Sequence, residues 1–96
     1  MYGTIAKVRL RQDVSADEAE RAFESLDRPE GSLGVFTLRC KSDAHELWIG
    51  GVFESEEVYY ASAGSPQQTE RFAKLRELMD GDPEWHDGEV INFTKY

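Results

Sequence analysis

The sequence predicts an α+β fold in which two amphipathic helices cover one face of an antiparallel four-stranded sheet. Alternating apolar and polar residues occupy 2–11, 33–41, 46–53 and 89–96, which is the period of a β-strand. Capped segments with helical spacing separate the first strand from the second and the third from the fourth. The resulting order, β-α-β-β-α-β, is the ferredoxin-like pattern, and we expect residues 1–96 to form a single domain.

The first strand and the first helix follow from local patterns. In residues 2–11, alternate positions are apolar, which gives the strand one apolar face. Ser15 begins Ser-Ala-Asp-Glu, a capping box in which its hydroxyl and Glu18 satisfy free amides at the start of a helix. Pro29 and Gly31 end that helix. Its apolar stripe consists of Ala19, Ala22, Phe23 and Leu26.

The next two strands form a predicted hairpin with a turn at 42–45. On the strand over 33–41, the residues expected on the core side are Phe36, Leu38 and Cys40. We interpret Cys40 as a small buried hydrophobic residue. On the strand over 46–53, Gly50-Gly51 indicates a bulge, or a place where a backbone or a ligand approaches closely.

The second half of the chain predicts a brief helix, a longer helix and a last strand. Ser55 is expected to cap a helical segment over 58–61. Ser65 and Pro66 open a helix that runs to Asp80 before Gly81, striped by Phe72, Leu75, Leu78 and Met79. The alternating residues 89–96 form the predicted last strand.

Two helices leave the second face of the sheet uncovered. The side chains expected on that face are Ile5, Val35, Ile91, Phe93, Lys7, Arg9 and Arg39. This mixture is too apolar to stay in water, and the chain supplies no third layer. We therefore expect a homodimer through the sheet face. The basic row, which also includes Arg11 and Lys41, would meet acidic groups across the dimer or bind an anion.

The charge distribution excludes several classes of partner. The chain has 19 acidic and 11 basic residues, and its net charge of −8 arises within residues 42–96. Nucleic acid and anionic membrane surfaces are therefore not expected partners. No apolar run approaches a membrane span, and no secretion signal opens the chain, so a cytoplasmic location is expected. A single cysteine excludes an internal disulfide.

Several stretches of the chain resemble the antibiotic biosynthesis monooxygenase-like (ABM) proteins. They are Val52–Tyr59, the helix opening Ser65-Pro66, Asp82–Val90 and the start Met1–Ala6. The resemblance implies a dimeric α/β barrel in which two ferredoxin-like protomers pair sheet to sheet. It also implies a pocket in each protomer between the helices and the sheet.

The resemblance also bears on activity. It implies a cofactor-independent monooxygenase acting on an apolar, aromatic small molecule, and the alternative is a non-catalytic small-molecule-binding or stress-related dimer. The haem-degrading branch of the family uses an Asn, a Trp and a His where this chain has Lys7, Phe53 and Thr69. Haem, and any other cofactor, is therefore not expected.

His86 and Asp87 are the candidate catalytic residues. A carboxylate beside a histidine raises the pKa of the imidazole and orients the ring, which suits a general base. The alternative is that both residues only cap a loop beside Trp85. A proton-handling group inside the pocket would favour an enzyme, whereas a His86 facing solvent over a pocket without other titratable groups would favour simple binding. His45 is expected in an exposed turn.

Aromatic side chains are the candidate substrate-binding residues, because flat apolar groups with a polar handle typically line small-molecule pockets. They are Trp48, Phe53, Tyr59, Tyr60, Phe72 and Trp85. The alternative is that these rings simply form the core. Asp82, Glu84, His86 and Asp87 could be a Mn or Fe cluster, but an extended segment would not bring them together, and no metal is expected.

Overall fold

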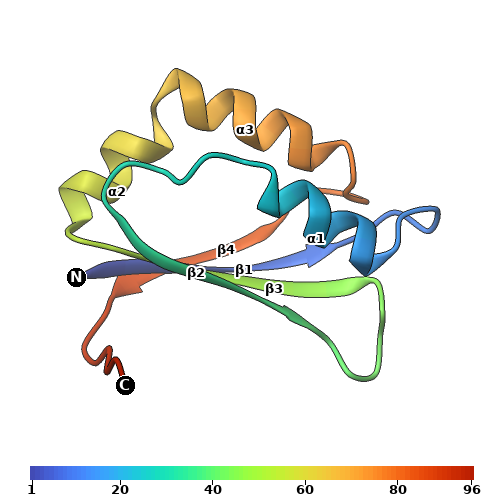
Figure 1. The fold of residues 1–96 in the computed structure, drawn as a ribbon, viewed down its shortest axis with the longest axis horizontal. Helices are drawn as coiled ribbons and strands as arrows, with labels where there is room; N and C mark the ends of the chain where they lie inside the picture. The colour runs from blue at the N-terminus through green and yellow to red at the C-terminus, as the bar shows by residue number, and fades with distance from the viewer.

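The computed structural model describes all 96 residues, and it contains one four-stranded sheet with the order β2-β3-β1-β4. Every neighbouring pair of strands is antiparallel. The elements are β1 (Tyr2–Arg9), α1 (Ala16–Glu24), β2 (Ser32–Arg39), β3 (Glu46–Phe53), α2 (Glu56–Ala63), α3 (Pro66–Arg76) and β4 (Glu84–Glu89). All three helices lie on one side of the sheet, and the chain after β4 turns away on the other side (Figure 1). The predicted ferredoxin-like α+β fold is confirmed.

Serine caps begin all three helices, as predicted. The hydroxyl oxygens of Ser15, Ser55 and Ser65 accept hydrogen bonds from backbone amides three residues later, at 3.1, 3.1 and 3.2 Å. Each cap satisfies a donor that the helix itself leaves free. The helix that begins at Pro66 ends at Arg76 rather than at Asp80. The following turn continues to Met79, which forms an isolated bridge with Leu10 of the segment after β1.

The buried core lies at one end of the covered face, between the sheet, α1 and α3. It consists of Ala6, Val8, Leu10, Val14, Ala19, Leu47 and Met79. Alternate residues of the central strand β1 point into it, because successive side chains of a strand point to opposite faces. Val8 and Leu10 are only 1% exposed, and each such side chain contributes about 1.5–3 kcal/mol by leaving water. This end of the covered face is apolar and closed.

The last strand lies earlier in the chain than the pattern 89–96 predicts. β4 covers Glu84–Glu89 and pairs with β1, with Glu89 opposite Tyr2. One further bond, from the Val90 amide to the Met1 carbonyl at 3.0 Å, ends the ladder. An antiparallel strand needs hydrogen-bonded partner backbone, and no strand pairing of β4 extends past this bond. Residues 91–96 therefore lie outside the sheet despite their alternation.

The faces of β2 are the reverse of those predicted. A register shift between Ser32 and Gly34 leaves Leu33 without a partner on β3, and it changes which alternate residues face the helices. Val35 and Arg39 consequently lie on the helix side, opposite Gly51 and Leu47. The residues predicted to be in the core, namely Phe36, Leu38 and Cys40, lie on the open face. Cys40 is only partly buried, with Sγ 3.4 Å from the Ser42 hydroxyl.

The two glycines of β3 do not form a bulge. β3 pairs continuously with β1, and a side chain makes the predicted close approach at Gly50. A Cβ atom added there would lie 2.3 Å from the Phe36 ring, so the ring rests directly on the glycine backbone. The glycine thus permits an aromatic ring to pack against the backbone of β3 on the open face.

The open face remains rich in exposed apolar groups. Ile5, Phe36 and Leu38 are 46, 51 and 56% exposed. Ile91 and Phe93, in the segment after β4, are also exposed. Contiguous apolar surface of this kind is typical of an interaction site. None of the helices has the length and apolar character that crossing a membrane requires.

Candidate functional site

A carboxylate surrounded by hydroxyl groups marks the other end of the covered face. Asp87 Oδ1 accepts hydrogen bonds from the Thr4 hydroxyl at 2.6 Å and from the Tyr59 hydroxyl at 3.1 Å. The Tyr60 hydroxyl lies 3.4 Å from Oδ2 of the same carboxylate. The Tyr60 oxygen is also 3.0 Å from the Tyr2 oxygen. We call Asp87, Thr4, Tyr59, Tyr60 and Tyr2 the hydroxyl cluster.

Strand register and a helix cap assemble the hydroxyl cluster. Asp87 on β4 is the direct partner of Thr4 on β1, so both side chains lie on the same face. The Ser55 cap fixes the start of α2, and the next turn places the adjacent Tyr59 and Tyr60 above the strands. Three parts of the chain, distant in sequence, thus deliver hydroxyl groups to one carboxylate.

Aromatic rings surround the hydroxyl cluster. The Tyr59 ring packs edge-on against Phe53, at 5.1 Å between centroids, and against Tyr60 at 4.9 Å. The Tyr2 ring lies 5.4 and 5.6 Å from the same two tyrosines. Such pairs contribute about 0.5–1.5 kcal/mol each beyond the area they bury. The packing holds the phenol oxygens at the carboxylate.

A second aromatic pair borders the hydroxyl cluster. Trp85 lies two residues before Asp87 on β4, and therefore on the same face. Its ring is 6.4 Å from that of Phe72 on α3. Trp85 is 48% exposed, so its indole presents a flat apolar surface that a planar molecule could cover.

Tyr59 and Tyr60 of the hydroxyl cluster both have raised pKa values. Burial of the Tyr59 phenol raises its pKa, and the negative charge of Asp87 adds to the effect. The pKa of Tyr60 is raised chiefly by its hydrogen bond to Tyr2, then by desolvation. Both phenols therefore act as donors around neutral pH, and Asp87 is the acceptor.

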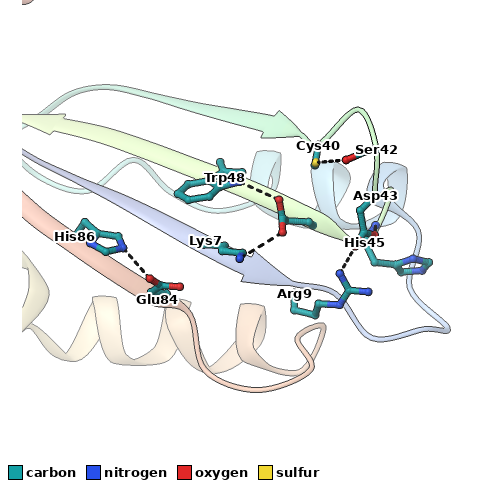
Figure 2. Close-up of polar contacts among 10 residues, drawn as sticks. Lys7, Arg9, Cys40, Ser42, Asp43, His45, Trp48, Glu84 and His86 are labelled. Atoms are coloured by element: carbon teal, nitrogen blue, oxygen red, sulfur yellow. Dashed lines mark hydrogen bonds and ion pairs between the residues drawn. The ribbon is translucent and has the colours of Figure 1, made fainter.

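His86 and Asp87 do not form the predicted pair. His86 is the partner of Ile5 and points to the open face, whereas Asp87 points to the helices. The imidazole Nε2 lies 3.1 Å from Glu84 Oε1, as Figure 2 shows. Adjacent residues of a strand face opposite ways, so a regular strand over 84–89 cannot bring these two side chains together.

The predicted aromatic set is divided between the two faces. Phe53, Tyr59, Tyr60, Phe72 and Trp85 all lie on the covered side. Trp48 lies on the open face, where its Nε1 donates to Glu46 Oε2 at 3.2 Å (Figure 2). Trp48 and Phe53 are five positions apart on one strand, an odd number, which indicates opposite faces. The same alternation places Tyr2 and Thr4, which sequence reasoning missed, beside Ala6 and Val8.

The basic row finds its acidic partners within the protomer. Lys7 Nζ lies 3.5 Å from Glu46 Oε1, and Arg9 pairs with Asp43 (Figure 2). The Arg9 guanidinium lowers the pKa of the Asp43 carboxyl. Arg39 does not belong to this row, since it lies on the helix side, 3.9 Å from Asp17. The open face thus carries charges that are largely paired.

The acidic segment before and within β4 does not converge on one point. Asp82 Oδ1 accepts from Arg76 Nε at 2.9 Å. Glu84 faces the opposite side of the sheet from Asp87. These side chains bond to three different parts of the molecule, as the extended backbone predicts.

Comparisons with known proteins find similar three-dimensional structures but no matching sequence family. No protein-family model matches the chain, and no curated protein matches its sequence. A protein of Chloroflexus aurantiacus J-10-fl, named for the antibiotic biosynthesis monooxygenases, is 23% identical with a TM-score of 0.80, covering 98% of this chain and 96% of that one. A similarly named protein of Caulobacter crescentus CB15 is 18% identical with a TM-score of 0.78, covering 95 and 90%.

A variant of SnoaB, a cofactor-independent oxygenase from Streptomyces nogalater, also matches. It is 14% identical with a TM-score of 0.79, and the likeness covers 96% of this chain and 94% of that one. At such identities the likeness concerns three-dimensional structure rather than chemistry. The chain therefore has the fold of the ABM-like proteins that its sequence resembles.

Proposed function

We propose that this protein is a small cofactor-independent monooxygenase that oxidises an apolar, aromatic small molecule at the hydroxyl cluster. The observation that carries the proposal is the Asp87 carboxylate, which accepts from Thr4 and Tyr59 and is bordered by Trp85. The arrangement joins a proton acceptor to flat apolar surfaces. SnoaB, which shares the fold, supports the class of reaction.

The chemistry needs one proton acceptor and a substrate that supplies its own electrons. Asp87 takes a proton from an acidic methylene of the substrate, and the carbanion transfers electrons to O₂ and forms a carbon–oxygen bond. Asp87 returns its proton to the outer oxygen, which gives a hydroperoxide. The remaining methylene hydrogen is then lost as a proton while the O–O bond breaks, so the methylene becomes a ketone and the outer oxygen leaves as water. One oxygen atom enters the substrate, the other enters water, and the substrate loses two hydrogens. Once Asp87 is protonated, the hydroxyls of Tyr59 and Tyr60 no longer donate to a charged carboxylate, and they turn to stabilise the developing oxyanion.

Anthrone, which carries such a methylene beside an aromatic ketone, is a direct probe. We expect oxygen consumption and a product that has gained one oxygen and lost two hydrogens. Asp87→Asn should lower kcat by about 10²-fold or more, because general base catalysis contributes 10²–10⁴-fold. Asp27→Asn, an exposed carboxylate on the segment after α1, is the matched control.

Variants at Asp87 and His86 test which face of the sheet carries the proton acceptor. Loss of turnover in His86→Gln with full activity in Asp87→Asn would place the proton acceptor on the open face and contradict the assignment. Absence of turnover with anthrone and with related planar methylene compounds, although they bind, would favour the alternative of a non-catalytic binding protein. The observation behind that alternative is that His86 lies away from the hydroxyl cluster.

The functional unit that we propose is a homodimer paired through the open face. Exposed Ile5, Phe36 and Leu38 support it, because a second copy would remove them from water. Native mass spectrometry should report a mass twice that of the 10.9 kDa chain. Phe36→Asp should give a monomer, whereas Leu33→Asp, at the exposed residue of the bulge itself, should leave the dimer intact. A strictly monomeric parent protein would contradict the pairing.

A further inference from the structure

We infer that a polar groove on the helical layer is a second binding site, and that its ligand is a small phosphorylated polyol. The groove has a volume of about 670 Å³ and lies between the segment 28–31, the outer side of α2 and the first turns of α3. None of the residues that bond Asp87 lines it. The site is therefore separate from the hydroxyl cluster and independent of its chemistry.

Two arginines without carboxylate partners line this groove. Arg28 and Arg71 take part in none of the ion pairs of the chain, although its net charge is −8. Arg28 donates to the Ser32 carbonyl from Nε at 2.9 Å and also from Nη2, and Arg71 Nη1 donates to Gln68 Oε1 at 2.7 Å. A guanidinium has five N–H donors, so both retain free donors in fixed positions. Arg9, Arg11, Arg39 and Arg76, by contrast, are all paired with acids.

The remaining polar side chains of the groove are acceptors and small donors. Glu30, Glu54, Ser62 and Gln67 line it, and none of their side chains forms a hydrogen bond within the chain. The positive end of α3, capped by Ser65, lies at the same place. The groove thus offers guanidinium donors for an anion and carboxylate acceptors for neutral O–H groups.

The wall of the groove is fixed by close packing. Gly31 has φ of +79°, a conformation that favours glycine, and an added Cβ would lie 2.1 Å from Val58 Cγ1. The segment 28–31 therefore rests directly on α2. A rigid wall loses little conformational entropy when a ligand binds.

The donor and acceptor set selects the ligand class. Guanidinium forks match phosphate oxygens, which they bind with two parallel hydrogen bonds. A bare anion would face the two glutamates, whereas a polyol attached to the phosphate would donate its hydroxyls to them. The volume lies within the ordinary range for small-molecule sites, roughly 300–1,000 Å³.

Isothermal titration calorimetry with glucose 6-phosphate, glucose and inorganic phosphate tests the inference. We expect saturable binding of the sugar phosphate, tighter than that of either component. Arg71→Gln should weaken it about tenfold or more, and Arg71→Lys should weaken it less, because it keeps the charge but loses the fork. Arg21→Gln is the matched control, since Arg21 on α1 also lacks an ion pair and does not line the groove.

Distinct outcomes would overturn the inference. No saturable binding of glucose 6-phosphate would remove the site, and equal weakening by Arg71→Gln and Arg21→Gln would reduce it to a general charge effect. If inorganic phosphate binds as tightly as the sugar phosphate, the inference that the ligand carries a polyol is wrong. Asp87→Asn should leave the titration unchanged while lowering the rate of oxygenation, so failure of one proposal is distinguishable from failure of the other.

Discussion

The two faces of the sheet satisfy their polar groups in different ways. On the helix side, Asp87 is neutralised by no cation and instead accepts from hydroxyl groups. On the open side, each acid has a basic neighbour, as in the pairs Lys7–Glu46 and Arg9–Asp43. Asp87 is thus a carboxylate that bonds only neutral donors. A face whose charges are already paired can instead meet another surface without leaving a charge unpaired.

The largest expected difference between the faces concerns stability. Leu10→Ala removes a buried side chain from the closed core and should lower the free energy of unfolding by about 2–5 kcal/mol. Leu38→Ala on the open face should cost well under half as much in dilute protein, because this side chain is 56% exposed. Urea denaturation of both variants measures the contrast. Equal losses would mean that the open face is as closely packed as the core.

Gly50 provides a sharper test of the open face. Gly50→Ala places a methyl group where the Phe36 ring lies, which should cost about 1–3 kcal/mol of stability by overpacking. Gly34→Ala is the control on the neighbouring strand, because nothing lies within 4 Å of an added Cβ there. Thermal unfolding should show a lower Tm for the first variant alone. An unchanged Tm in Gly50→Ala would show that the ring moves freely.

The tyrosines of the covered face predict an alkaline limit. The folded protein raises the pKa of Tyr59 above its ordinary value of about 10, so the folded state holds this proton more tightly than the unfolded chain does. The contribution to stability is complete below pH of about 10 and is lost as the pH rises through the raised value. Tyr59→Phe should remove the part of the alkaline loss of stability that arises from this phenol. Tyrosinate absorbance and unfolding curves recorded together measure it.

The smallest expected effect lies in the charged row of the open face. Because Arg9 lowers the pKa of Asp43, the pair stabilises the folded state above the ordinary aspartate pKa, and this contribution is lost as the pH falls through the lowered value. Asp43→Asn should slightly reduce the fall in the free energy of unfolding at acid pH. Added salt should make this difference between the variant and the parent smaller. Asp27→Asn should leave the acid part of the stability curve unchanged. A large, salt-independent change would instead indicate a buried pair.

Sequence patterns predicted the covered face better than the open one. The serine caps and the alternation of β1 are local features, and the helix starts and Ala6, Val8 and Leu10 lie where they indicate. The faces of β2 depend on a bulge at Leu33, which has no local signal. The bounds of β4 depend on its pairing with β1, which the residues of β4 alone do not specify.

The candidate site was predicted only in part for the same reason. Asp87 and most of the aromatic residues were identified by residue type, and Tyr59 and Tyr60 were found by their place on α2. The pairing of Asp87 with Thr4 requires a strand register between distant segments, which a single sequence does not specify. The expected partnership of His86 with Asp87 failed because their segment is extended rather than looped.

The register of β4 makes the length of the 80–83 connection a determinant of chemistry. The Asp80 amide bonds the Arg9 carbonyl at 2.8 Å, and Arg76 holds Asp82, so this short connection sets where the strand begins. A deletion or insertion of one residue there would exchange the two faces of β4, sending Asp87 to the open side and His86 beneath the helices. One inserted codon would therefore place the His86 imidazole opposite Thr4 in place of the carboxylate, whereas one deleted codon would place Gly88 there.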